Sequence, residues 1–170
     1  MISKARLIYN PVSGHEQMPK NVATTLDVLE RAGYEASAYR TTRKKKSAQN
    51  EATRAAKEGF DLIVAAGGDG TINEVVNGIA FLDKRPKMAI IPAGTTNDYA
   101  RALNIPRDSI SAAAKVILKK KTRKMDIGKA NFKVGDDQYF VNIAACGSLT
   151  ELTYGVPSEV KSALGYAAYL

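Results

Sequence analysis

Short apolar runs alternate along the chain with longer stretches in which apolar residues recur every three or four positions. Runs of the first kind are typical of buried strands, and stretches of the second kind are typical of helices that cover a sheet. The pattern predicts strands over 5–9, 34–41, 62–66 and 87–91, and helices over 21–31, over 47–58, from about 71 and from about 110. Repeated strand–helix units indicate an α/β fold in which helices cover both faces of a parallel sheet.

A glycine-rich turn, Gly-Gly-Asp-Gly-Thr from Gly67 to Thr71, joins the third strand to the third helix. Such a turn before a helix N-terminus receives phosphate, because glycine can adopt positive φ and leaves backbone N–H groups accessible to an anion. Thr71 and Glu74 have the spacing of a capping box, which predicts that they fix the start of this helix. The face of the helix that is expected to be buried carries Ile72, Val75, Val76 and Ile79.

The same turn lacks two features of common phosphate loops. No lysine follows it as in a Walker loop, and Asn73 stands where a dinucleotide fingerprint has its third glycine. Both of those loop types are therefore excluded. A tight connection without a ligand remains an alternative for this turn considered alone.

From about residue 122 the pattern changes to strand, turn and strand. It predicts strands over 125–134 and 138–145 around a turn at 135–137, a further strand over 149–154, and a helix over 158–170. We expect a nucleotide-binding α/β domain over 1–122 and the beginning of an antiparallel, β-rich second domain over 123–170. Because the last predicted helix has no C-cap and no closing strand, we expect the sequence to be a fragment of a longer protein.

Three polar loops follow predicted parallel strands, at 10–14, 67–71 and 92–98, and Thr41, at the end of the second strand, faces the same edge. Open α/β sheets bind ligands at the carboxyl ends of their strands. Three loops rich in Gly, Asn, Ser and Thr at one edge would supply backbone and hydroxyl donors to a nucleotide. Together they favour a nucleotide site over a tight connection without a ligand.

Composition narrows the choice of partner. The 170 residues are 45% hydrophobic and have a net charge of +8, concentrated at 43–46 and 115–133. These basic clusters suit ATP phosphates or an anionic membrane surface, or are simply solvated. Nucleic acid ranks last because no aromatic residues are interleaved with the charges. No apolar run is long enough for a membrane span and no signal peptide is visible, so a cytoplasmic location is expected. The single cysteine, Cys146, is expected to be packed rather than reactive.

Three motifs resemble the bacterial diacylglycerol kinase family, which also includes sphingosine and ceramide kinases. They are Asn-Pro-x-Ser-Gly at 10–14, Gly-Gly-Asp-Gly-Thr-x-Asn-Glu-Val-x-Asn-Gly at 67–78, and Pro-x-Gly-Thr-x-Asn-Asp-Tyr-Ala-Arg at 92–101. The resemblance continues through 124–128 and spans essentially the whole chain. Only the Gly-Gly-Asp-Gly turn is shared more widely, with NAD kinases and phosphofructokinases, and the resemblance implies a nucleotide domain of that kind.

The resemblance implies an ATP- and Mg²⁺-dependent lipid kinase that converts diacylglycerol to phosphatidic acid. Its nucleotide site would comprise Asn10, Pro11, Val12, Ser13, Gly14, Thr41, Gly67, Gly68, Asp69, Gly70, Thr71, Ile72, Asn73, Glu74 and Thr95. Asp69 is a candidate to orient Mg²⁺ or to hold the loop, and Glu74 is expected mainly to cap the helix. The family's general base and most Mg²⁺ ligands would lie beyond Leu170, so this fragment is expected to bind ATP without necessarily transferring phosphate. His15 is outside the motif and is expected to be a solvent-facing loop residue.

Two alternatives from other classes stay open: an NAD kinase-like phosphotransferase, and a noncatalytic nucleotide-binding module. For a lipid kinase, the partner would be diacylglycerol or a related lipid at an anionic membrane surface. The resemblance then implies peripheral contact with the inner face of the membrane, without a transmembrane segment, and the sequence shows no lipid-anchor motif. A homo-oligomer remains open.

Overall fold

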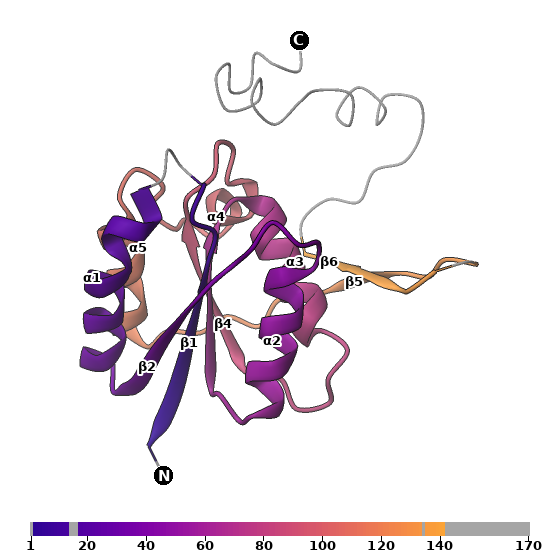
Figure 1. The fold of residues 1–170 in the computed structure, drawn as a ribbon, viewed down its shortest axis with the longest axis horizontal. Helices are drawn as coiled ribbons and strands as arrows, with labels where there is room; N and C mark the ends of the chain where they lie inside the picture. Colours follow the sequence, from indigo (N-terminus) through magenta and orange to yellow (C-terminus); the bar gives the residue numbers. More distant parts are fainter. Residues whose placement is uncertain (1, 14–16, 134, 142–170) are drawn as a thin grey trace.

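Four parallel strands form the sheet at the centre of the molecule (Figure 1). The computed structural model describes residues 2–13, 17–133 and 135–141. The strands lie in the order β2-β1-β3-β4, and they are β1 (Ser3–Tyr9), β2 (Tyr34–Arg40), β3 (Leu62–Gly67) and β4 (Lys87–Pro92). The four predicted strands are therefore confirmed, with ends that differ by at most two residues.

Helices cover both faces of this sheet. Figure 1 shows α1 (Gln17–Arg31) and α5 (Ile110–Lys115) on one side, and α2 (Ser47–Lys57) and α3 (Asp69–Ile79) on the other. Every residue of the central strand β3 is buried, and its side chains alternate between the two apolar clusters on the two faces. The predicted α/β fold is confirmed. Because the strands are parallel, all of their carboxyl ends lie at one edge.

The capping box predicted at the start of α3 is wrong. The helix begins at Asp69 with Gly68 as its N-cap, and the backbone N–H of Thr71 already donates to the carbonyl of Gly68. The Glu74 carboxylate instead accepts a hydrogen bond of 2.9 Å from the backbone N–H of Ala48, in the first turn of α2. The N-cap of α2, Lys46, makes no side-chain capping bond, so Glu74 satisfies a helix end that would otherwise lack this partner. The buried face predicted for α3 is confirmed.

Two helices differ from the pattern. The structure has a short helix, α4 (Asp98–Ala102), which begins at the end of the loop predicted at 92–98 and was not predicted, because five residues are too few to show a periodic apolar face. The helix α1 begins four residues earlier than predicted, with a proline, Pro19, in its first turn, where the missing N–H is tolerated. The helix α5 continues as a 3₁₀ turn, η1 (Val116–Lys119).

A two-stranded antiparallel sheet follows, as predicted, and Figure 1 shows it projecting beside α3. Its strands are β5 (Gly128–Ala130) and β6 (Gln138–Phe140), with Lys129 opposite Tyr139. The first strand is shorter than predicted, and the second is described only as far as residue 141.

Several predicted features lie outside the described residues: Gly14, His15, Cys146, the strand over 149–154 and the helix over 158–170. Among the helices that the structure does describe, none is long and apolar enough to cross a bilayer.

Candidate functional site

Loops from all four strands are tied together at the carboxyl edge of the sheet. The backbone N–H of Thr41 donates to the carbonyl of Tyr9, that of Asn10 to the carbonyl of Ala66, and that of Ala93 to the carbonyl of Gly67, each at 2.9 Å. These bonds continue the sheet ladder past the strand ends. The structure thus brings the three motif loops and Thr41 to one edge.

The inside of the glycine turn is packed against protein atoms. A Cβ on Gly94 would lie 2.5 Å from the Cα of Gly68, and a Cβ on Gly67 would lie 2.5 Å from Oγ1 of Thr71. The expectation of positive φ in this turn is wrong: Gly68 has a φ of −81°, and no glycine from 67 to 70 is among the positive-φ residues. Close approach of two loops, and not left-handed backbone, requires glycine at these positions.

Gly70 is different, because a Cβ built on it would meet no atom of the other described residues within 4 Å. It lies exposed in the first turn of α3, and its φ is not positive. Within the described part of the chain, no hydrogen bond is made by the backbone N–H groups of Gly68, Asp69 or Gly70. The helix therefore presents N–H donors that have no partner among the described residues, together with the positive end of its dipole, at an exposed position.

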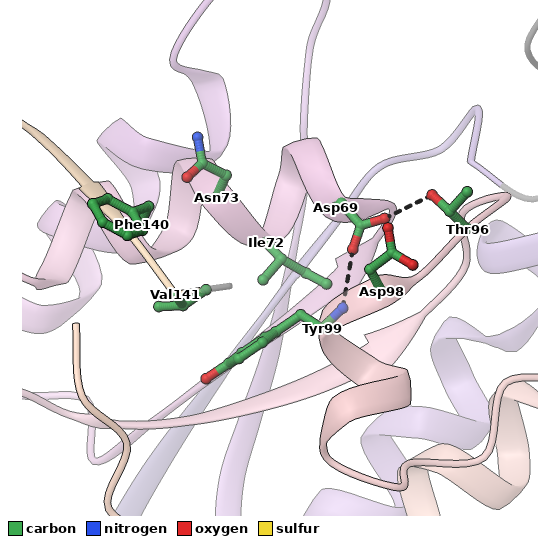
Figure 2. A pocket seen from close by; sticks show the side chains of 8 residues that line it. All are labelled: Asp69, Ile72, Asn73, Thr96, Asp98, Tyr99, Phe140 and Val141. Atoms are coloured by element: carbon green, nitrogen blue, oxygen red, sulfur yellow. Dashed lines mark hydrogen bonds between the residues drawn. The ribbon is translucent and has the colours of Figure 1, made fainter. Parts of the chain in front are cut away.

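Asp69 links this helix end to the third motif loop. Its Oδ2 accepts a hydrogen bond of 3.0 Å from the hydroxyl of Thr96, and its Oδ1 lies 3.5 Å from the backbone N–H of Tyr99 (Figure 2). Of the two roles considered for Asp69, these contacts match the one in which it holds the loop. Among the described residues, no group of three His, Cys, Asp or Glu side chains could hold a metal ion.

The third motif loop is also braced from within by Asn97. This residue is in the left-handed region, with a φ of 51°, and only 5% of it is exposed. Its Oδ1 accepts from the backbone N–H of Gly94 and its Nδ2 donates to the carbonyl of Gly94, both at 2.8 Å. The side chain of Asn97 thereby pairs both the N–H and the carbonyl of Gly94.

A cavity of about 320 Å³ opens beside the N-terminal half of α3 (Figure 2). Its lining is acidic and polar at one end, where Asp69, Thr96 and Asp98 lie, and apolar at the other, where β6 ends. Burial raises the pKa of Tyr99 above its ordinary value, which keeps the phenol protonated. The lining comprises Asp69, Ile72, Asn73, Thr96, Asp98, Tyr99, Phe140 and Val141.

Sequence reasoning assigned only Asp69, Ile72 and Asn73 of these lining residues to the site. Asp98 and Tyr99 stand inside the motif at 92–101, which was a signal that could have found them. Phe140 and Val141 had no such signal, because nothing local indicates that their strand returns to α3.

Most of the other predicted site residues lie at the carboxyl edge of the sheet, but not all of them face the glycine turn. Asn10 stabilises its own loop, because its Oδ1 accepts from the backbone N–H of Val12 at 3.1 Å. Thr95 is exposed at the same edge. Glu74 is bonded to α2, away from the glycine turn, and Ile72 is a core residue that also lines the cavity. The remaining predicted residues, Pro11, Ser13 and Thr41, are partly exposed at the loop edge.

The chain matches the family model described as the diacylglycerol kinase catalytic domain over residues 4–130. It therefore belongs to that family, as the resemblance in the three motifs indicated. It is 54% identical over 172 residues to a diacylglycerol kinase of Bacillus subtilis (strain 168), covering 99% of this chain and 54% of the relative. It is 51% identical over 169 residues to a diacylglycerol kinase of Staphylococcus aureus (strain bovine RF122 / ET3-1), covering 99% of this chain and 51% of the relative.

A solved structure also has a similar fold. The crystal structure of a diacylglycerol kinase from Bacillus anthracis str. Sterne matches with a TM-score of 0.70 and 34% identity, covering 82% of this chain and 46% of that chain. The chain spans about half the length of the curated relatives it matches.

Proposed function

We propose that this chain provides the nucleotide-binding part of an ATP- and Mg²⁺-dependent lipid kinase, which phosphorylates the free hydroxyl of diacylglycerol to give phosphatidic acid. Membership of the diacylglycerol kinase family supports the reaction class. The observation that carries the proposal lies at the rim of the glycine turn, where Gly70 is exposed and the backbone N–H groups of Gly68, Asp69 and Gly70 make no hydrogen bond to another described residue.

Phosphate suits this rim for two physical reasons. The first backbone N–H groups of a helix have no partner within the helix, and the helix dipole places about half a positive charge there. The second reason is steric, because Gly70 has no side chain to hold an anion away. The ATP phosphates would then lie over Gly68 to Gly70, with Asn10, Ser13, Thr41 and Thr95 as further donors at the same edge.

The charge of Asp69 would oppose a bound phosphate unless a cation lies between them. The oxygen donors of Asp69 and Asp98, which line one cavity, fit Mg²⁺, since this ion is usually held by one or two carboxylates together with phosphate oxygens. Mg²⁺ supplies positive charge that offsets the phosphate charge during transfer. No described residue is assigned as the general base.

The cavity suits the acceptor. Its apolar end, formed by Ile72, Phe140 and Val141, would pack against the glycerol ester, while its acidic end faces the glycine turn. Such a lipid stays in the bilayer, so the enzyme would work as a cytoplasmic protein at the inner membrane face. The exposed lysines 119–121 would assist docking on anionic lipid. Charge reversal there is expected to weaken binding to anionic liposomes, and unchanged binding would contradict this role.

The test is transfer of labelled γ-phosphate from ATP by the full reading frame that encodes this chain, with diacylglycerol micelles and NAD offered in parallel. Label in phosphatidic acid, with a requirement for Mg²⁺, is the expected result. Label in NADP would instead assign an NAD kinase-like activity. Nucleotide binding with label in neither product would leave the noncatalytic module.

A further inference from the structure

Asn77 is a polar residue in the buried part of α3, with only 5% of its surface exposed. Its Nδ2 donates to the backbone carbonyl of Tyr139 at 2.9 Å, and its Oδ1 accepts from the backbone N–H of the same residue at 2.8 Å. The Nδ2 group also donates to the carbonyl of Asn73 at 2.9 Å. Both N–H donors and the carbonyl oxygen of the side chain are therefore used.

This arrangement reproduces the bonding of a neighbouring strand. In an antiparallel ladder, two residues that form a hydrogen-bonded pair exchange both N–H···O bonds. Asn77, which lies in a helix 62 residues away in the sequence, gives the Tyr139 backbone a donor and an acceptor as a paired strand residue would. The strand β6 is therefore paired with β5 on one edge and with a helix side chain on the other.

The residues directly after Tyr139 form part of the cavity wall. Phe140 and Val141 line the cavity together with Asp69 and Asp98 from the loops of the sheet edge. The ring of Phe140 lies over Gly128, where a Cβ would overlap it, so its position depends on the position of the whole hairpin. The bond from Asn77 is the polar contact that ties this hairpin to α3.

We propose that Asn77 is a positioning residue that fixes β6 on α3, and thereby holds Phe140 and Val141 where the acceptor lipid contacts them. Asn77 itself faces the Tyr139 backbone, and it acts on the site only through that strand. The role of Asn77 in lipid binding rests on the proposed lipid kinase function. The pair of hydrogen bonds between the Asn77 side chain and the Tyr139 backbone, here called the clamp, does not depend on that function. Loss of Asn77 should therefore weaken use of the lipid and leave ATP binding unchanged.

The experiment compares the unmodified protein with Asn77→Ala, with Asn77→Asp, and with Asn21→Ala as the matched control. Asn21 lies in α1 and makes the same bond to the carbonyl four residues earlier, at 2.9 Å, without a strand partner. Amide hydrogen exchange at Tyr139, the ATP dissociation constant and the KM for diacylglycerol in micelles are measured for each protein.

We expect Asn77→Ala to raise exchange at Tyr139 at least tenfold and the lipid KM about tenfold, with the ATP dissociation constant within twofold. Asn77→Asp keeps an acceptor for the Tyr139 N–H but replaces the donor to the Tyr139 carbonyl with a second acceptor, so it should also raise exchange at that amide. Asn21→Ala should change none of the three. Rapid exchange at Tyr139 in the unmodified protein, or continued protection in Asn77→Ala, would overturn the clamp.

An equal loss of ATP affinity and lipid KM in Asn77→Ala would overturn the positioning role. If Asn77→Ala does not fold, Asn77→Asp and the exchange rate at Tyr139 in the unmodified protein still decide whether the clamp exists. If no protein phosphorylates diacylglycerol, the proposed function fails, and exchange at Tyr139 still tests the clamp.

Discussion

Glycine occurs both on the packed inside of the glycine turn, at Gly68 and Gly94, and on its exposed rim, at Gly70, but the structure requires it only on the inside. Inside, Gly94 lies so close to Gly68 that a Cβ on Gly94 would be 2.5 Å from the Gly68 backbone, and a Cβ on Gly68 would be tight at 3.3 Å. At the rim, a Cβ on Gly70 would meet no atom of the other described residues within 4 Å, and its φ is ordinary, so packing within the described part of the chain does not require glycine. The comparison separates glycines that the fold needs from a glycine that a ligand would need.

The largest expected effect on stability comes from the inside of the turn. Gly94→Ala places a Cβ against backbone, which cannot move aside as a flexible side chain could, and should lower the free energy of unfolding by about 1–3 kcal/mol. Urea denaturation measures this loss. Gly70→Ala is the control and should raise stability by up to about 1 kcal/mol, because glycine is unfavourable in a helix. Equal stabilities for both variants would contradict the distinction.

The next largest loss of stability is expected at Asp69, which joins the first turn of α3 to the motif loop at 92–98. Asp69→Ala removes the acceptor of the Thr96 hydroxyl and should lower the free energy of unfolding by about 1–2 kcal/mol. Thr96→Val removes the same bond from the other side and should cost less, since the Tyr99 contact survives. Thermal unfolding measures both. A larger loss for Thr96→Val than for Asp69→Ala would show that Asp69 does not hold this loop.

A smaller effect is expected at Glu74, one turn further along α3. Glu74→Ala removes the acceptor for the Ala48 N–H and should destabilise the protein by about 1 kcal/mol, the usual value of a lost helix cap. Because the Glu74 carboxylate is bonded to α2, the ATP dissociation constant of the folded variant should not change. A tenfold weaker affinity for ATP would instead place Glu74 in the nucleotide site.

The smallest effect concerns pH. Burial raises the pKa of Tyr99, so the folded protein keeps a phenolic proton that the unfolded chain releases near its ordinary value of about 10. The resulting stabilisation is complete below that value and is lost as the pH rises from about 10 towards the higher folded-state pKa. Above pH 10, Tyr99→Phe should therefore lose stability less steeply than the unmodified protein. Parallel curves from pH 9 to 11 would contradict this.

Local patterns predicted the fold well because strands and helices have different periods. The uninterrupted run of β3 and the apolar spacing from Ile72 to Ile79 each carry their own signal, and both are confirmed. The bond from Glu74 to Ala48 and the clamp from Asn77 to Tyr139 join residues 26 and 62 positions apart. Their side chains satisfy backbone groups that only the folded chain brings within reach, so spacing predicted neither.

Two glycine variants of α3 test whether the rim of the glycine turn receives the ATP phosphates. Gly70→Val fills the open space at the rim, whereas Gly78→Ala puts a Cβ into the backbone of α2 near Gln49, away from the turn. Titration with Mg²⁺-ATP, beside a thermal melt, measures both. Gly70→Val should fold normally and bind ATP at least 100-fold more weakly, a loss of about 2.7 kcal/mol. Gly78→Ala should be less stable and retain its affinity for ATP. A stable Gly70→Val that binds ATP as tightly as the unmodified protein would contradict the account.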